Sequence, residues 1–198
     1  MKLIIASNNN HKITEIKQIL SPWFADVISM GDAGISLEVV EDGQTFVENS
    51  LKKAREVFDA LGGIYAVLAD DSGLSVDALS GAPGVYSARF AREHDDAANN
   101  EKLLSLMKDI PDGKRSAKFV CVVSLIRPDS EPLVVRGECH GVVARSLSGS
   151  RGFGYDPLFF VPELGKTFSQ LSEGEKNAIS HRGRALALLR DALERESE

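Results

Sequence analysis

The sequence has little of what marks several common classes of protein. Only two of its 198 residues are cysteine, Cys121 and Cys139, and they form no CxxC pair. Such sparse cysteine is typical of a reducing compartment, so we expect two buried free thiols and a cytoplasmic location; a disulfide between neighbouring strands is the alternative. No hydrophobic run is long enough to span a membrane, and residues 3–6 are too short for the core of a signal peptide.

Positive charge is also scarce. The chain has 23 Lys and Arg against 29 Asp and Glu, a formal net charge of -6. Binding to duplex nucleic acid needs clustered Lys and Arg, so we expect no nucleic-acid partner. A protein of this charge that binds a polyphosphate needs local cations or a metal ion. At 198 residues the chain is long enough for one sizeable core, or for one core with a second lobe, and we expect residues 1–198 to form a single domain.

Several motifs of other enzyme classes are missing. The sequence contains no HExxH, no GxSxG and no GxGxxG after a strand. The tripeptide Gly165-Lys166-Thr167 resembles the end of a P-loop, but that motif requires a glycine five residues before Gly165. Position 160 is Phe160, so we exclude a P-loop.

An acidic stretch follows a run of small and apolar residues near the middle of the chain. Residues 65–69 predict a short buried strand, and Asp70-Asp71-Ser72-Gly73 comes directly after them. Ligands in open α/β sheets bind outside the carboxyl ends of strands, and paired acids suit a hard divalent cation. An ordinary turn explains the same residues equally well. Residues 74–78 alternate and predict a second strand that leaves this turn.

The N-terminal segment predicts a strand, a polar loop and a helix. Residues 2–6 form the expected strand, and apolar residues at helical spacing predict a helix that runs to about Leu20. Between them lies the loop Ser7-Asn8-Asn9-Asn10-His11-Lys12. Backbone N–H groups at a helix start bind anions, and Lys12 adds a positive charge. An ordinary loop in which Ser or Asn caps the helix is the alternative.

A capping box, Thr45 with Glu48, predicts a long helix that ends at Gly62-Gly63. Its expected apolar face is Val47, Leu51, Ala54, Val57 and Leu61. Glu41 lies just before this helix, where the chain could approach the acidic stretch; a solvated carboxylate is the alternative.

The second half of the chain predicts mostly strands. Residues 117–126 predict a central strand, residues 133–136 return in a hairpin, and residues 85–90, 137–144 and 158–161 predict further strands. Adjacent antiparallel strands make the expected sheet mixed.

Two further stretches carry chemical groups. The glycine-rich stretch 149–157 contains Phe153, Gly154, Tyr155 and Asp156, which offer ring faces and an acceptor to a base; a turn whose aromatic side chains fill the core is the alternative. A second capping box, Ser172 with Glu175, opens a helix that contains Lys176, and a final helix follows Ser180-His181-Arg182-Gly183. Lys176, His181 and Arg182 are three close donors, although such residues more often form a solvated helix face.

Taken in order, these motifs resemble the inosine triphosphate pyrophosphatase family, whose members hydrolyse noncanonical purine nucleotides such as dITP, ITP and XTP. The resemblance covers nearly the whole chain. It rests on the loop 7–12, Glu41, Thr45-Phe46-Val47-Glu48-Asn49, Ala69-Asp70-Asp71-Ser72-Gly73-Leu74, residues 81–90, Gly152-Phe153-Gly154-Tyr155-Asp156-Pro157 and residues 180–183.

The resemblance implies an α/β fold, with a long twisted mixed sheet, flanking helices and two lobes around a central cleft, in a homodimer. It implies that the loop of Ser7, Asn8, Asn9, Asn10, His11 and Lys12 holds the triphosphate. It implies that Glu41 and Asp71, with Asp70 close by, hold Mg²⁺, and that Asp71 serves as the base for the attacking water. Ser72 is expected to touch the substrate, and the purine is expected to contact Phe153, Gly154, Tyr155, Asp156, Lys176, His181 and Arg182.

Two other functions stay open at this level. One is a pyrophosphatase for other modified nucleoside triphosphates, with the same phosphate chemistry and a different base pocket. The other is a nucleotide-binding sensor that does not hydrolyse its ligand, against which the set Lys12, Glu41, Asp70 and Asp71 argues. A phosphatase of the haloacid type is disfavoured because the acidic stretch lacks its spaced DxD arrangement.

Overall fold

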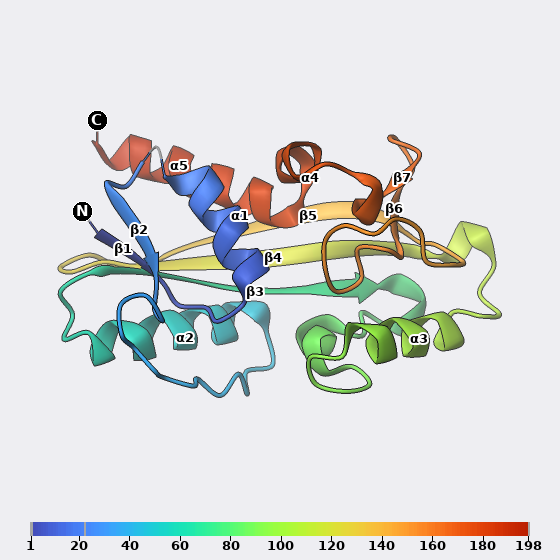
Figure 1. The fold of residues 1–198 in the computed structure, drawn as a ribbon, viewed down its shortest axis with the longest axis horizontal. Helices are drawn as coiled ribbons and strands as arrows, with labels where there is room; N and C mark the ends of the chain where they lie inside the picture. The colour runs from blue at the N-terminus through green and yellow to red at the C-terminus, as the bar shows by residue number, and fades with distance from the viewer. Residues whose placement is uncertain (1, 22, 198) are drawn as a thin grey trace. The chain divides into compact units, whose positions relative to one another are not determined.

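The computed structural model describes residues 2–21 and 23–197 (Figure 1). The strands are β1 Lys2–Ile5, β2 Asp26–Ser29, β3 Ala66–Val76, β4 Ser116–Ile126, β5 Leu133–Val143, β6 Phe159–Val161 and β7 Lys166–Thr167. The α-helices are α1 Asn10–Leu20, α2 Phe46–Ala60, α3 Asp96–Leu106, α4 Glu173–Ile179 and α5 His181–Ser197. Pro22, which we expected to help end the first helix, lies outside the described residues.

The strands form one seven-stranded sheet in the order β2-β1-β3-β4-β5-β6-β7. Strand β1 pairs in parallel with β2 and with β3, whereas β6 pairs antiparallel with β5 and with β7. The predicted mixed sheet with flanking helices is therefore confirmed. Among the residues described, no helix has the length and hydropathy needed to cross a membrane.

The chain divides into two compact units, each assembled from separate segments. Unit 1 comprises Met1–Asp71, Cys121–Gly137 and Arg182–Glu198, and unit 2 comprises Ser72–Val120 and Glu138–His181. Each unit has its own hydrophobic core. Cys121 in unit 1 and Cys139 in unit 2 are buried free thiols, as predicted.

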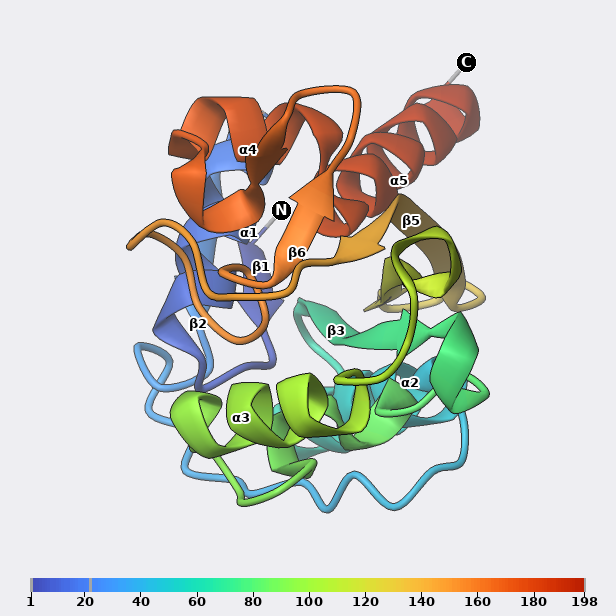
Figure 2. The same cartoon turned by 90° about the vertical axis from the view of Figure 1, so that its right-hand side faces the viewer.

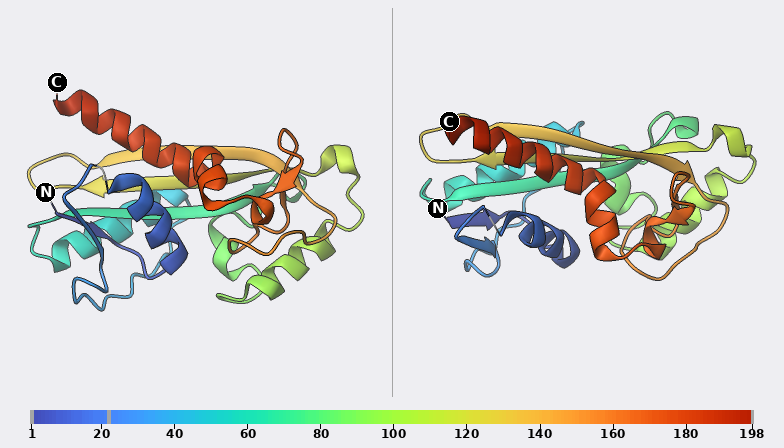
Figure 3. Two further views of the ribbon diagram at one scale, coloured as in Figure 1. Left: turned by 45° about the horizontal axis from the view of Figure 1, so that its top comes forward. Right: turned by 90° about the horizontal axis from the view of Figure 1, so that it is seen from above.

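In unit 1, helices cover both faces of the sheet. Residues of α1 and α5 pack with Ala66 and Leu68 of β3, and residues of α2 pack with Val67 and Ala69 (Figures 1 and 2). Figure 3 shows α5 in front of the strands when the molecule is seen from above. Since successive side chains of a strand point to opposite faces, this register directs Asp70 towards α1 and α5 and Asp71 towards α2.

In unit 2, the core joins apolar residues of α3, β4, β5 and β6 to a cluster of rings. The ring centroids of Phe119 and Phe159 lie 4.6 Å apart, and those of Phe159 and Phe168 lie 4.8 Å apart. These separations are in the range that favours edge and tilted aromatic pairs. The short helix α4 begins at the predicted capping box of Ser172 and Glu175.

Three predicted elements differ from the structure. The acidic stretch is not a turn between two strands, because β3 runs without interruption from Ala66 to Val76. Residues 85–90 are not a strand; Gly84–Arg89 is a 3-10 helix in which the Ser87 hydroxyl donates to the Gly84 carbonyl oxygen at 2.7 Å. Residues 133–143 form one strand, and Gly137 and Gly141 lie within it.

The α4 capping box gives a pH-dependent contribution to stability. The Glu175 carboxylate accepts hydrogen bonds from the Ser172 N–H and hydroxyl, both at 2.8 Å, and these bonds lower the pKa of Glu175 to about 2. A pKa below the unfolded value contributes stability above the unfolded pKa of about 4.3, and that stability is lost as the pH falls towards 2.

We therefore expect Glu175→Gln to lower the free energy of unfolding at pH 7 and to lower it less at pH 3. Urea denaturation at the two pH values measures both differences. Glu163→Gln, at an exposed position, is the matched control and should have little effect at either pH. An equal loss for Glu175→Gln at pH 7 and pH 3 would contradict the assignment of this pKa shift.

Candidate functional site

Asp70 and Asp71 lie where β3 extends beyond the end of its neighbour β1. The last backbone hydrogen bond between the two segments runs from the Ala6 N–H to the Leu68 carbonyl oxygen, at 2.8 Å. The chain then leaves the sheet, and α1 begins at Asn10 with Asn9 as its N-cap, so the second half of the predicted polar loop 7–12 is the first turn of this helix. The sequence predicted that the two aspartates follow the end of a strand. The strand that ends here is β1, and the aspartates lie on the adjacent strand β3, which continues past that end.

Asp70 is the centre of a buried network of charges. Its Oδ2 lies 3.1 Å from Lys12 Nζ and 3.0 Å from Arg182 Nη2, and Asp70 and Arg182 are each only 1% exposed. Arg182 also binds Glu15 of α1. The thiol of Cys121 lies 3.9 Å from Asp70 Oδ2. The network thus joins α1, β3, β4 and α5 through one carboxylate.

The charges of this network favour the ionised state of the two cations. Burial by itself lowers the pKa of Lys12 and Arg182 lowers it further, but Asp70, Asp71 and Cys121 together outweigh them, so that the pKa lies above its ordinary value. Burial likewise opposes the charge of Arg182, but Asp70, Cys121 and Glu15 together more than offset it, so the pKa of Arg182 is also raised. The network therefore favours the charged form of Lys12 at the start of α1.

Asp71 faces the opposite side of the sheet. Asn49 of α2 donates from Nδ2 to Asp71 Oδ2 at 2.9 Å. Burial raises the pKa of Asp71, and Glu41 raises it further, while Lys12, Asn49 and Lys53 act in the other direction. Because burial and Glu41 prevail, the ionised carboxylate of Asp71 carries a free-energy cost in the folded protein.

Glu41, in the segment that precedes α2, forms an ion pair with a lysine of that helix. Lys53 Nζ lies 2.6 Å from Glu41 Oε1, and the side chains of Lys53 and Glu41 are 11% and 30% exposed. Across residues 2–21 and 23–197, no three His, Cys, Asp or Glu side chains gather closely enough to hold a metal ion. The acidic oxygens of Glu41 and Asp71 nevertheless suit a hard divalent cation that keeps waters or phosphate oxygens in its shell.

The polar loop makes the predicted helix cap. Asn9 Oδ1 accepts the Lys12 N–H at 3.1 Å, and Ser7 Oγ accepts the Asn9 N–H at 3.1 Å. Asn8, Asn9, Asn10 and His11 are exposed. The capping interpretation is thus confirmed, and the N-terminal end of α1 also presents backbone N–H groups, which suit an anion.

In unit 2, Asp156 is the centre of a second charged cluster. Its Oδ2 lies 2.7 Å from Lys176 Nζ and accepts the Phe153 N–H at 3.0 Å. Lys176 Nζ also lies 4.7 Å from the Phe153 ring centroid. A Cβ at Gly152 would come within 2.0 Å of Asp156 Oδ2, so this position requires glycine.

The remaining predicted base-site residues have different surroundings. The His181 ring stacks on Phe119 with centroids 4.7 Å apart, and it is 5% exposed. Tyr155 is buried, and its hydroxyl donates to the Ser87 carbonyl oxygen at 2.9 Å. The Gly154 N–H donates to Asp96 Oδ2 at 2.7 Å. Ser72 is half-buried and follows Asp71 directly in β3.

Sequence reasoning missed four residues that contact the predicted site: Glu15, Asn49, Lys53 and Cys121. It also grouped Arg182 with Lys176 and His181, whereas the Arg182 guanidinium binds Asp70 and Glu15.

The sequence of α2 contains one signal for two of the missed residues: Asn49 and Lys53 are four residues apart and so share a face of the helix. Both are buried, with Ser50, Ala54 and Val57, so the inner face includes polar positions and excludes the exposed Val47.

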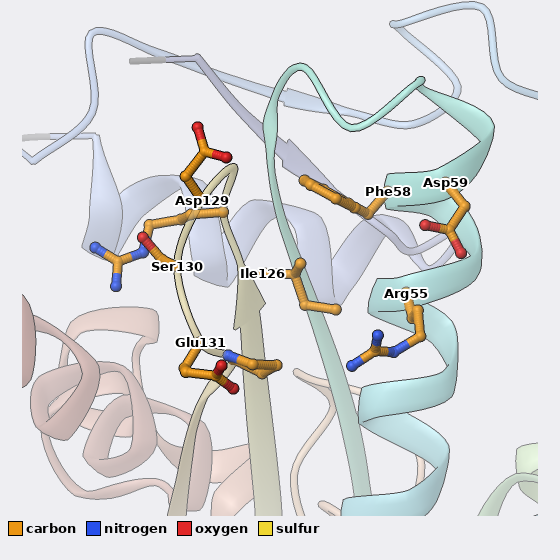
Figure 4. A pocket seen from close by; sticks show the side chains of 9 residues that line it. Arg55, Phe58, Asp59, Ile126, Asp129, Ser130 and Glu131 are labelled. Atoms are coloured by element: carbon orange, nitrogen blue, oxygen red, sulfur yellow. The ribbon is translucent and has the colours of Figure 1, made fainter.

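A separate groove in unit 1 contains none of the predicted site residues. It has a volume of about 310 Å³ and lies between α2 and the β4–β5 hairpin (Figure 4). Its lining combines two arginines with three carboxylates, namely Arg55, Arg127, Asp59, Asp129 and Glu131.

The two adjacent aspartates predict opposite effects on stability. Asp70→Asn leaves the buried Arg182 and the half-buried Lys12 without their shared carboxylate, which should cost about 3 kcal/mol or more of unfolding free energy. Asp71→Asn keeps an oxygen to accept from Asn49 and removes a charge that burial disfavours. Stability linked to a raised carboxylate pKa is lost as the pH rises, so at pH 7 this variant should be at least as stable as the wild type.

Urea denaturation of the two variants at pH 7 tests this difference. Each variant changes the same atom type at neighbouring positions, so each serves as the control for the other. Similar losses of unfolding free energy in both would show that the two carboxylates do not have distinct environments.

A family model, related sequences and solved structures all match this chain over nearly its whole length. The family model described as the Ham1 family matches residues 3–192. A dITP/XTP pyrophosphatase of Clostridium perfringens is 52% identical over 197 residues, covering 97% of each chain. The structure of the Staphylococcus aureus Ham1 protein matches with a TM-score of 0.88 and 45% identity, covering 99% of this chain and 100% of that one.

A nucleoside-triphosphatase, dITP/XTP pyrophosphatase, of Mycobacterium abscessus matches with a TM-score of 0.77 and 45% identity, covering 96% of this chain and 98% of that one. Identity at this level over nearly the whole length, together with the shared fold, shows that the chain belongs to the Ham1 family.

Proposed function

We propose that this chain hydrolyses deaminated purine nucleoside triphosphates, dITP, ITP and XTP, to the nucleoside monophosphate and pyrophosphate. The observation that carries the proposal is the similarity, over 97% of both chains, to a protein named dITP/XTP pyrophosphatase. Two features of the molecule support it: carboxylates and a half-buried lysine at the start of helix α1 in unit 1, and a charged aromatic cluster in unit 2.

We propose that residues 7–12 bind the triphosphate and that Lys12 is the main cation for it. The raised pKa of Lys12 keeps the amine charged, and the exposed Asn8, Asn10 and His11 leave the loop accessible to solvent. A fixed cation beside the phosphoryl oxygens stabilises the negative charge that develops in the transition state. The hydrogen bond between Asn9 and the Lys12 backbone fixes this cation at the start of α1.

The donor set of Glu41 and Asp71 fits Mg²⁺, with Asp70 close by in sequence. When bound, Mg²⁺ would offset phosphate charge and make a bound water a better nucleophile. Asp70 is already held by Lys12 and Arg182, so we propose that it acts through Lys12. Asp71 would accept the proton of the attacking water, and the cations that oppose its burial, Lys12 and Lys53, favour the ionised form that this role needs.

The base-binding role is proposed for Phe153, Gly154, Tyr155, Asp156, Lys176 and His181, with Arg182 and Ser72 contributing to substrate contact. Hypoxanthine and xanthine carry a 6-keto acceptor and an N1–H donor. Lys176 and His181 would donate to the keto group, and Asp156 would accept from the ring. Adenine reverses this pattern and would leave buried polar groups unpaired, which discriminates strongly.

We propose that residues 1–198 act as one catalytic domain and that two copies form a homodimer in the cytoplasm, without nucleic-acid or membrane partners. The family model, which matches residues 3–192, supports one domain. The net charge of -6 supports the absence of nucleic acid.

The direct test incubates the purified protein with dITP and Mg²⁺ and separates the products by anion-exchange chromatography. We expect dIMP and pyrophosphate, with little turnover of dATP and dGTP, and no turnover by the Asp71→Asn variant. Orthophosphate as the first product would contradict the reaction, comparable turnover of dGTP would contradict the base assignment, and binding of dITP without hydrolysis would indicate a nucleotide sensor.

A further inference from the structure

Asn49 connects the two segments that carry the proposed metal carboxylates. Its Nδ2 donates to Asp71 Oδ2 at 2.9 Å, and its Oδ1 accepts the Gly43 N–H at 2.8 Å. Gly43 lies two residues after Glu41, and Asn49 itself is completely buried. One side chain on α2 therefore fixes both a residue of β3 and the backbone that follows Glu41.

The orientation of the Asn49 amide follows from its partners. The Gly43 N–H is a donor, so the amide oxygen must face it, and the NH₂ group is left to face Asp71. Asn49 therefore holds Asp71 Oδ2 in one position through its NH₂ group, while its oxygen holds the Gly43 backbone.

The segment between Glu41 and α2 is closely packed on this amide. A Cβ at Gly43 would lie 2.6 Å from Asn49 Oδ1 and 2.8 Å from Glu48 Cβ, so a larger residue there would displace the amide. Glu48 Oε2 accepts the Gln44 and Thr45 N–H groups at 2.7 and 3.1 Å. The backbone from Gly43 to Thr45 is thus fixed to the first turn of α2 at three successive N–H groups.

We propose that Asn49 is a positioning residue, which orients the Asp71 carboxylate and ties it to the Glu41 segment so that both carboxylates meet the same divalent cation. This inference rests on the proposed function. Hydrogen-bond partners of metal ligands commonly change metal affinity or activity by about 10- to 100-fold when they are removed.

The test compares Asn49→Leu, which keeps the approximate shape without either hydrogen bond, with Asn49→Ala in case the larger variant does not fold. Thr45→Ala is the matched control, because it removes the cap of the same helix without touching the Asn49 amide. Measurements are kcat, KM for dITP, the Mg²⁺ concentration for half-maximal rate, and Mn²⁺ affinity in the presence of an α,β-methylene analogue of dITP.

For both Asn49 variants we expect kcat to fall and the required metal concentration to rise by about 10- to 100-fold, with KM for dITP within about twofold. Thr45→Ala should lower the melting temperature alone. If the Asn49 variants lower the melting temperature but keep the wild-type kcat and Mn²⁺ affinity, the residue is only structural and the inference is wrong. Failure of the wild type to hydrolyse dITP would instead contradict the proposed function, and the Mn²⁺ affinities would still test Asn49.

Discussion

The rest of the site depends on the buried contact of Asp70 with Lys12 and Arg182. Charges removed from water are tolerated only when they are paired, and here one carboxylate serves two cations from different helices. The contact fixes α1 and α5 to the same strand and favours the charged form of Lys12 beyond the end of β1. A polar loop that would otherwise be an ordinary helix cap thereby gains a permanent positive charge, which is what a protein of net charge -6 needs in order to bind a polyphosphate.

Asp71 differs from Asp70 because successive residues of a strand face opposite sides. Asp70 forms ion pairs with Lys12 and Arg182, whereas Asp71 accepts a hydrogen bond from Asn49. Burial and the charge of Glu41 raise the pKa of Asp71 more than Lys12, Asn49 and Lys53 lower it. The protein therefore keeps one aspartate permanently neutralised by partners and leaves its neighbour costly to ionise. A carboxylate that is costly to ionise gains most from a bound divalent cation. We therefore assign metal binding and proton transfer to Asp71, and the positioning of Lys12 and Arg182 to Asp70.

Much of the fold could be predicted from local sequence, and much of the site could not. The capping boxes at Thr45 and Ser172 marked helix starts correctly because both partners of each box lie within four residues. The prediction of a turn at Asp70-Asp71 was wrong because the length of a strand depends on the strands beside it. Strand β1 ends at Ile5, but the local sequence does not reveal that β3 continues to Val76. Asn49 and Lys53 were missed because polar residues on a helix suggest a solvated face until the burial of that face is known. The side chains that contact Asn49 and Lys53, those of Asp71 and Glu41, lie 22 and 12 residues away in the sequence, so no local pattern reveals these pairs.

The central claim is that the adjacent aspartates have separate tasks, and the affinity for Mn²⁺ tests it most directly. The measurement is made on Asp70→Asn and Asp71→Asn with an α,β-methylene analogue of dITP bound, at a temperature where both variants are folded. The account predicts that Asp71→Asn loses Mn²⁺ binding while Asp70→Asn retains most of it. Loss of Mn²⁺ binding in Asp70→Asn to the same extent as in Asp71→Asn would contradict the account.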